Sequence, residues 1–130
     1  MEYLYTIENI KRILIISENP RRALSECEIC SKLPEKLSKV NIPERSEFGV
    51  FPHEVSRLEE FILIKYSWLI LKCPLCNRLY TDEYRYEHLV GGSEDVYVIS
   101  RIDYNNALEM LKDIKAKKLV KDGARWLVMR

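Results

Sequence analysis

Four cysteines in two pairs, Cys27-Glu-Ile-Cys30 and Cys73-Pro-Leu-Cys76, are the residues of this chain best suited to chemistry. Two residues between paired cysteines let both sulfurs reach one ion from a tight turn, whose backbone N–H groups can bond to the thiolates. Two such turns complete a tetrahedral site of four sulfurs, which suits Zn²⁺. Because the protein fills all four positions, we expect one structural, non-catalytic zinc ion bound by Cys27, Cys30, Cys73 and Cys76.

The spacing of the pairs predicts what such an ion joins. The 42 residues between them exceed the roughly 15–20 residues of a compact ribbon, so the ion would join the N-terminal third of the chain to a central hairpin. Two other interpretations stay open. One is a thiol–disulfide redox pair at Cys73 and Cys76, although such pairs begin a helix and the residues after Cys76 favour a strand. The other is four buried cysteines without a ligand.

The sequence predicts a cytoplasmic protein that does not enter a membrane. The N-terminus lacks the basic start and the small-residue cleavage site of a signal peptide. The longest uncharged apolar stretch, 66–71, is much shorter than the ~20 residues of a membrane span. In a reducing cytosol, paired cysteines are more often metal ligands or redox groups than structural disulfides.

The composition is typical of one domain, over residues 1–130, and 47% apolar residues exclude a disordered chain. The 21 Lys and Arg residues against 20 Asp and Glu residues exclude a strongly cationic binding protein. The charge is uneven, because residues 46–100 carry a net −4 and residues 101–130 a net +4. We therefore expect two faces of opposite sign.

A candidate partner surface follows the second cysteine pair. If this segment is a strand, the alternation of side chains places four aromatic residues on the same face: Tyr80, Tyr84, Tyr86 and His88. Such a face could stack bases or bind a protein, and the surrounding carboxylates oppose nucleic acid. The plainer interpretation is that the rings cover the edge of the core with their hydroxyls at the surface.

The basic C-terminal region supports an alternative function, that of a zinc-containing nucleic-acid-binding or regulatory protein. Its candidate phosphate contacts are Lys115, Lys117, Lys118, Lys121 and Arg125. A helix followed by a two-stranded turn is similar to the end of a winged-helix domain. The plainer interpretation is a solvated face with lysines that compensate the helix dipole.

Apolar spacing predicts the elements that position these residues. Helices are expected at 6–18, 53–64 and 103–118, with Thr6 and Asp103 as N-caps. A short helix is expected between Pro20 and the first cysteine pair, and irregular structure at 34–52.

Strands are expected at 67–72 and 79–88, joined by a hairpin across the second cysteine pair. A second hairpin is expected at 119–129 around Asp122-Gly123. Gly91-Gly92 predicts a turn, and the segment after it fits a helix start at Ser93-Glu94-Asp95 or a strand rich in valine.

Residues 72–101 contain Lys-Cys-Pro-Leu-Cys, Tyr80, Glu-Tyr-Arg-Tyr-Glu at 83–87, Gly-Ser-Glu-Asp at 92–95, and Arg101. This quarter of the chain resembles a group of small, uncharacterised bacterial proteins with a Cys-Pro-x-Cys knuckle, a Tyr-rich segment and a Gly-Ser-Glu-Asp turn. The resemblance implies a helix after Asp95 and no established activity. Proteins of this sort sometimes resemble immunity or accessory proteins of bacterial competition systems.

Together these observations predict an α+β fold with N-terminal helices, a central zinc-knuckle β-hairpin, and a C-terminal helix followed by a short β-hairpin. The expected function is a non-enzymatic, zinc-stabilised protein that binds another protein.

Overall fold

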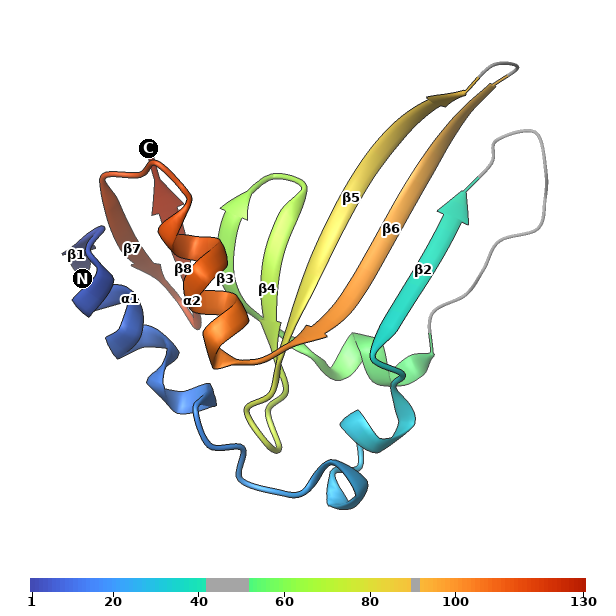
Figure 1. Ribbon diagram of the computed structural model, residues 1–130, viewed down its shortest axis with the longest axis horizontal. Coiled ribbons are helices and arrows are strands. Elements are labelled where there is room, and N and C mark those ends of the chain that lie inside the picture. Colours follow the sequence, from blue (N-terminus) through green and yellow to red (C-terminus); the bar gives the residue numbers. More distant parts are fainter. Residues whose placement is uncertain (42–51, 90–91) are drawn as a thin grey trace.

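The computed structural model describes residues 1–41, 52–89 and 92–130, and within these ranges the side chains other than those of 39–41, 85–89 and 92–94. The described strands form one sheet in the order β1-β7-β8-β3-β4-β5-β6-β2 (Figure 1). Neighbouring strands are antiparallel except β3 and β8, which are parallel. The strands are β1 (Glu2–Leu4), β2 (Lys36–Asn41), β3 (Glu59–Lys65), β4 (Trp68–Lys72), β5 (Leu79–Leu89), β6 (Gly92–Ile102), β7 (Lys118–Asp122) and β8 (Arg125–Met129).

The helices of the described chain are short. They are α1 (Ile7–Leu14), α2 (Tyr104–Lys112) and the 3₁₀ turns η1 (Ile15–Ser17), η2 (Leu24–Glu26), η3 (Cys30–Lys32) and η4 (His53–Arg57). The predicted fold class is therefore wrong, because the chain is built mainly on one large mixed sheet and not on N-terminal helices around a small hairpin.

Three segments account for this error. The predicted helix at 53–64 is the turn η4 followed by strand β3, because its short apolar run also suits a strand with a buried face. Residues 36–41, expected to be irregular, form β2, and the rest of that stretch up to 51 lies outside the described residues. The helix start at Ser93 is also wrong, because 92–102 is strand β6, whose Val96, Val98 and Ile99 are buried.

Several local predictions are confirmed. Thr6 caps α1 by accepting a hydrogen bond from the Asn9 N–H, and Asp103 caps α2 in a reciprocal capping box with Asn106. Strands β4 and β5 pair across the second cysteine pair, and β7 and β8 pair across a turn with Gly123 at a φ of +61°. The predicted turn at Gly91-Gly92 lies in part outside the described residues.

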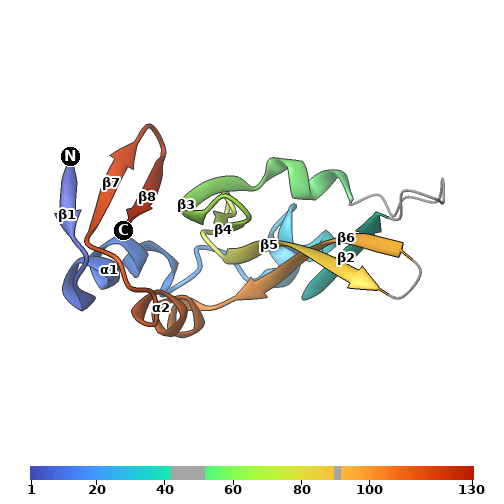
Figure 2. The same cartoon turned by 90° about the horizontal axis from the view of Figure 1, so that it is seen from above.

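Two cores lie on opposite faces of the sheet. Successive residues of β4 point to opposite faces and so belong to different cores. Ile70 packs beneath α1 and α2, whereas Leu69 and Leu71 face the cysteine segment. Figure 2 shows α2 on one side of the sheet and the green segment of η4 on the other. The second core surrounds the four cysteines with apolar side chains of the cysteine segment and of the sheet: Ile29, Leu33, Leu71, Tyr80 and Ile99. The four cysteines therefore lie at the centre of the second core, enclosed by these apolar side chains.

Candidate metal centre

The turn between β4 and β5 carries the second cysteine pair. The Cys73 N–H donates to the Arg78 carbonyl over 2.9 Å, and the Asn77 N–H donates to the Cys73 carbonyl over 2.9 Å. Asn77 has a φ of +70°, a left-handed conformation that asparagine tolerates better than most residues. This closed turn holds the sulfurs of Cys73 and Cys76 on one side of the hairpin.

The first cysteine pair lies in the irregular segment that precedes β2. The Ser31 N–H donates to the Cys27 carbonyl, and the Cys30 N–H donates to the Cys27 sulfur over 3.4 Å. The segment then enters β2, which pairs with β6 and so fixes the pair over the sheet. Neither cysteine pair begins an α-helix.

The four cysteine sulfurs lie within 4.8 Å of one another, and all four residues are at most 1% exposed. The closest contacts join the two pairs: Sγ of Cys27 and Cys73 are 3.7 Å apart, and Sγ of Cys30 and Cys76 are 3.5 Å apart. With Zn–S bonds of about 2.3 Å, a tetrahedron of sulfurs has edges of about 3.8 Å. The prediction that the pairs come together is confirmed, and the cluster could hold a metal ion.

The pKa values of these thiols bear on how they could bind a cation. Burial opposes ionisation of Cys27, but hydrogen bonds from the N–H groups of Cys30 and Ile29 and from the thiols of Cys76 and Cys73 together lower the pKa of Cys27 to about 7. Burial raises the pKa of Cys30 above its usual range, and it raises the pKa of Cys73. Four thiolates this close repel one another, so a bound dication is what would allow all four to ionise.

Tyr80 and Arg101 extend from the sheet to the sulfur cluster. Tyr80 is 1% exposed, and its hydroxyl donates to the Cys30 sulfur, an interaction that lowers the pKa of that thiol. Nε of Arg101 donates to the Tyr80 oxygen over 3.3 Å, and the guanidinium also lies over the Tyr80 ring. Such outer contacts orient a metal ligand and stabilise its charge. The chain Arg101–Tyr80–Cys30 therefore directs positive charge toward the sulfurs.

Arg101 also fixes the cysteine segment to the sheet. Its Nη2 donates to the Leu33 carbonyl over 2.6 Å and to the Cys30 carbonyl over 3.4 Å. On the other side of the site, Arg21 donates from its backbone to the Cys76 carbonyl and from its side chain to Oδ1 of Asn77. Sequence reasoning assigned no site role to Arg21, Asn77 or Arg101. The only signal was Arg101, a charged residue at the valine- and isoleucine-rich end of β6.

The structure separates the residues of the predicted partner surface. Tyr80 is buried in the second core, so the prediction that it forms a partner surface is wrong. Tyr84 is half-buried, and its hydroxyl donates to Asp95. Tyr86 and His88 belong to β5, but their side chains lie outside the described residues.

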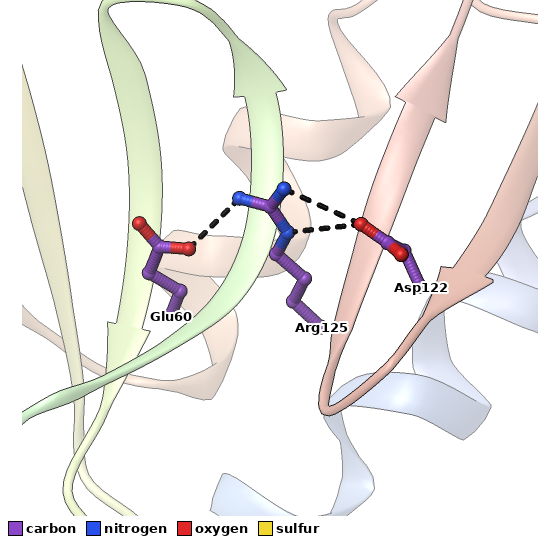
Figure 3. Close-up of polar contacts among 3 residues, drawn as sticks. All are labelled: Glu60, Asp122 and Arg125. Carbon is purple, nitrogen blue, oxygen red and sulfur yellow. Dashed lines mark hydrogen bonds and ion pairs between the residues drawn. The ribbon is translucent and has the colours of Figure 1, made fainter.

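The predicted phosphate contacts are largely engaged within the protein. Arg125 donates to Glu60 over 2.8 Å and to Asp122 over 3.3 Å (Figure 3). Lys118 pairs with Glu2 over 3.4 Å, and Lys121 lies over the Trp126 ring. Lys115 and Lys117 are exposed. These engagements weaken the positive field on which binding to phosphates would depend.

A scan of protein-family models and searches of curated proteins and solved structures found no significant match to this chain. The resemblance of residues 72–101 to small bacterial proteins therefore stays a prediction. The helix that it implied after Asp95 is contradicted by strand β6. Over the described part of the chain, no helix is both long enough and apolar enough to cross a membrane.

Proposed function

We propose that the four cysteines bind one structural zinc ion, and that the protein acts without catalysis as a module that binds another protein. The observation that carries the metal assignment is the geometry of the buried sulfurs, whose 3.5 and 3.7 Å contacts are close to the edge of a zinc–thiolate tetrahedron. Zinc is the favoured ion because soft thiolates in tetrahedral geometry suit it.

The surroundings of the sulfurs support a structural role for the ion. Protein sulfurs fill all four positions, so no position is left for a substrate or an activated water. The burial of the cysteines also counts against a thiol–disulfide enzyme, because its attacking sulfur must reach a substrate disulfide. A closed, buried metal site leaves the binding role to the protein surface.

The ion would fasten the N-terminal third of the chain to the sheet. It would join cysteines 46 residues apart in sequence, and closing a loop of that length is worth about 4 kcal/mol in the chain-entropy model of a cross-link. Within the second core the ion would add to the apolar contacts that Ile29 and Leu33 of the cysteine segment already make. We therefore expect the metal to contribute much of the stability of this half of the protein.

The test is metal analysis of protein purified without chelator, followed by thermal unfolding with EDTA. We expect one zinc ion per chain and a large fall in the unfolding temperature when EDTA is added. EDTA saturated beforehand with zinc is the control and should leave the temperature unchanged. Protein without bound zinc would overturn the metal assignment. Unchanged stability after zinc removal would overturn the structural role alone.

A further inference from the structure

An open hollow lies where α1 meets the C-terminal end of α2, which packs beside it (Figure 1). It has a volume of about 380 Å³, and among its lining residues are Tyr5, Ile7, Ile10, Lys112, Ile114 and Lys115. All of these side chains belong to the described part of the chain. Its volume falls in the range of roughly 300–1,000 Å³ that is typical of binding pockets.

Hydrogen bonds hold the two walls of the hollow together. The Tyr5 hydroxyl donates to the Leu111 carbonyl of α2 over 2.6 Å, and the Tyr5 N–H donates to the Lys117 carbonyl over 3.0 Å. The Ile114 N–H donates to the Leu111 carbonyl over 3.3 Å and closes the turn that follows α2. The hollow is therefore preformed, so a ligand would bind without first ordering its walls.

The floor of the hollow is apolar. Ile10 is 2% exposed and belongs to the first core, and Tyr5, Ile114 and Ala116 pack against that core. Ile7, which also lines the hollow, is 44% exposed. An apolar side chain of a partner that entered the hollow would cover Ile7, and removing both surfaces from water would stabilise the contact.

Two lysines add positive charge to this apolar lining. Lys115 is exposed, and Lys112 pairs with Glu109 over 3.4 Å in an exposed contact that water weakens. None of the described residues that line the hollow is acidic. Burial raises the pKa of Tyr5 to about 12, and the charge of Arg130 partly offsets this rise, so a third positive group lies near. The hollow is thus complementary to apolar side chains flanked by carboxylates.

We propose that this hollow binds an acidic segment of a partner protein, in which large apolar side chains are flanked by aspartate or glutamate. The inference rests on the proposed protein-binding role and does not depend on the metal. A nucleic acid fits the site less well, because it would offer phosphates to the lysines but no flexible apolar side chain to Ile7 and Ile10. A membrane surface is flat and would contact Ile7 without filling the hollow.

The test is a titration of the ¹⁵N-labelled, zinc-loaded full chain with a short Gly/Ser peptide that carries two leucines flanked by glutamates. We expect chemical-shift changes centred on Ile7, Ile10 and Lys115. A control peptide with glutamine in place of glutamate should bind about three- to tenfold more weakly, as expected for the loss of exposed ion pairs. A control peptide with serine in place of leucine should bind at least about tenfold more weakly, because burial of leucine contributes more than an exposed ion pair.

Two pairs of variants separate the hollow from the rest of the surface. Ile7→Ser should weaken binding of the test peptide about three- to tenfold, because the peptide covers this half-exposed side chain. Ile16→Ser is the matched control, since Ile16 is 41% exposed and lies outside the hollow, and it should leave binding unchanged. Lys115→Gln should weaken binding about threefold, whereas Lys36→Gln, at an exposed lysine of β2, should not. Comparable spectra away from the hollow check the fold of each variant.

Absence of shifts at the hollow, equal binding of either control peptide, or unchanged binding by Ile7→Ser would each overturn the inference. Separate arms use vesicles of anionic lipid and a short DNA duplex, and tighter binding of either at this hollow would also overturn it. These results leave the metal assignment intact, because zinc content is measured separately on the same samples. A partner protein cross-linked to this chain at a distant surface would overturn the inference while supporting the wider binding role.

Discussion

Tyr80→Phe tests whether the sheet tunes the metal centre through Cys30. The substitution removes one hydroxyl and keeps the buried ring, so it deletes the hydrogen bond to the Cys30 sulfur and the acceptor of the Arg101 Nε. Arg101 keeps its bonds to the carbonyls of Cys30 and Leu33. The cysteine segment therefore stays attached to the sheet, and the change acts mainly on the charge of one sulfur.

The size of the effect follows from the kind of bond that is lost. A hydrogen bond to a charged group contributes about 1.5–3 kcal/mol, which corresponds to roughly 10- to 100-fold in an equilibrium constant. Loss of an outer contact of a metal ligand commonly lowers metal affinity by a similar factor. We expect Tyr80→Phe to weaken zinc binding by this amount.

The assay combines competition for zinc by a coloured chelator with the absorption spectrum of the Co²⁺-substituted protein. Without its hydrogen bond, the Cys30 thiolate should donate more readily, so the sulfur-to-cobalt band should move to lower energy. Tyr5→Phe is the matched control, because it deletes the hydroxyl of another tyrosine, which is half-buried and donates to the Leu111 carbonyl in the first core. It should cost about 1 kcal/mol of stability and leave the cobalt spectrum unchanged.

The reasoning is refuted if Tyr80→Phe retains the zinc affinity and the cobalt spectrum of the unmodified protein. An equal spectral shift in Tyr5→Phe would also refute it, because the change would then reflect general destabilisation.

Three further predictions concern Cys76 and Asn77 in the turn between β4 and β5, and Asp82 of β5. Cys76→Ser should lower the zinc content below one ion per chain and lower the unfolding temperature sharply, as measured by metal analysis and calorimetry; full zinc content would count against Cys76 as a ligand. Asn77→Ala should lower the free energy of unfolding by about 1–2 kcal/mol, because alanine is strained at this left-handed φ and cannot accept the hydrogen bond from Arg21. Asn77→Gly should cost less, because glycine adopts this φ without strain. Denaturant unfolding measures both variants, and the reverse order would contradict the turn geometry. Asp82→Asn should raise the free energy of unfolding at pH 7, because the raised pKa of the Asp82 carboxyl makes its ionised form less favourable in the folded state than in the unfolded chain. In denaturant unfolding at several pH values, this gain should shrink as the pH falls toward 3.8, the ordinary pKa of the group. A gain that grows as the pH falls would contradict the reasoning.

The sequence predicted the local features whose chemistry is contained in a few residues. The spacing of the cysteines, the capping residues Thr6 and Asp103, and the Asp122-Gly123 turn each depend on contacts within a few positions of the chain. The meeting of the two cysteine pairs was also predictable. A four-sulfur site requires both pairs to come together, whatever path the chain takes between them.

The sheet was not predictable in the same way. Strand β2 has no strong periodicity of its own and is fixed by pairing with β6, 54 or more positions later in the chain. The run at 59–65 has both helical and strand-like spacing, and it forms a strand that pairs with β4 on one side and with the C-terminal strand β8 on the other. Long-range pairing of this kind overrides local preference.

The candidate site shows the same division. Cysteine spacing named the ligands, but the role of Tyr80 depends on which face of β5 meets the cysteine segment. An alternating aromatic pattern predicts a common face and does not say whether that face is buried or exposed. Asp82 and Tyr84 share the face of Tyr80 but lie beyond the cysteine segment, where they line a separate hollow together with Tyr66 and Tyr97.

X-ray absorption at the zinc edge of the protein as purified tests the central claim most directly. We expect four sulfur neighbours at about 2.3 Å and no nitrogen or oxygen neighbour. Fewer than four sulfurs, a light ligand at about 2.0–2.1 Å, or the absence of zinc would contradict a closed centre formed by Cys27, Cys30, Cys73 and Cys76.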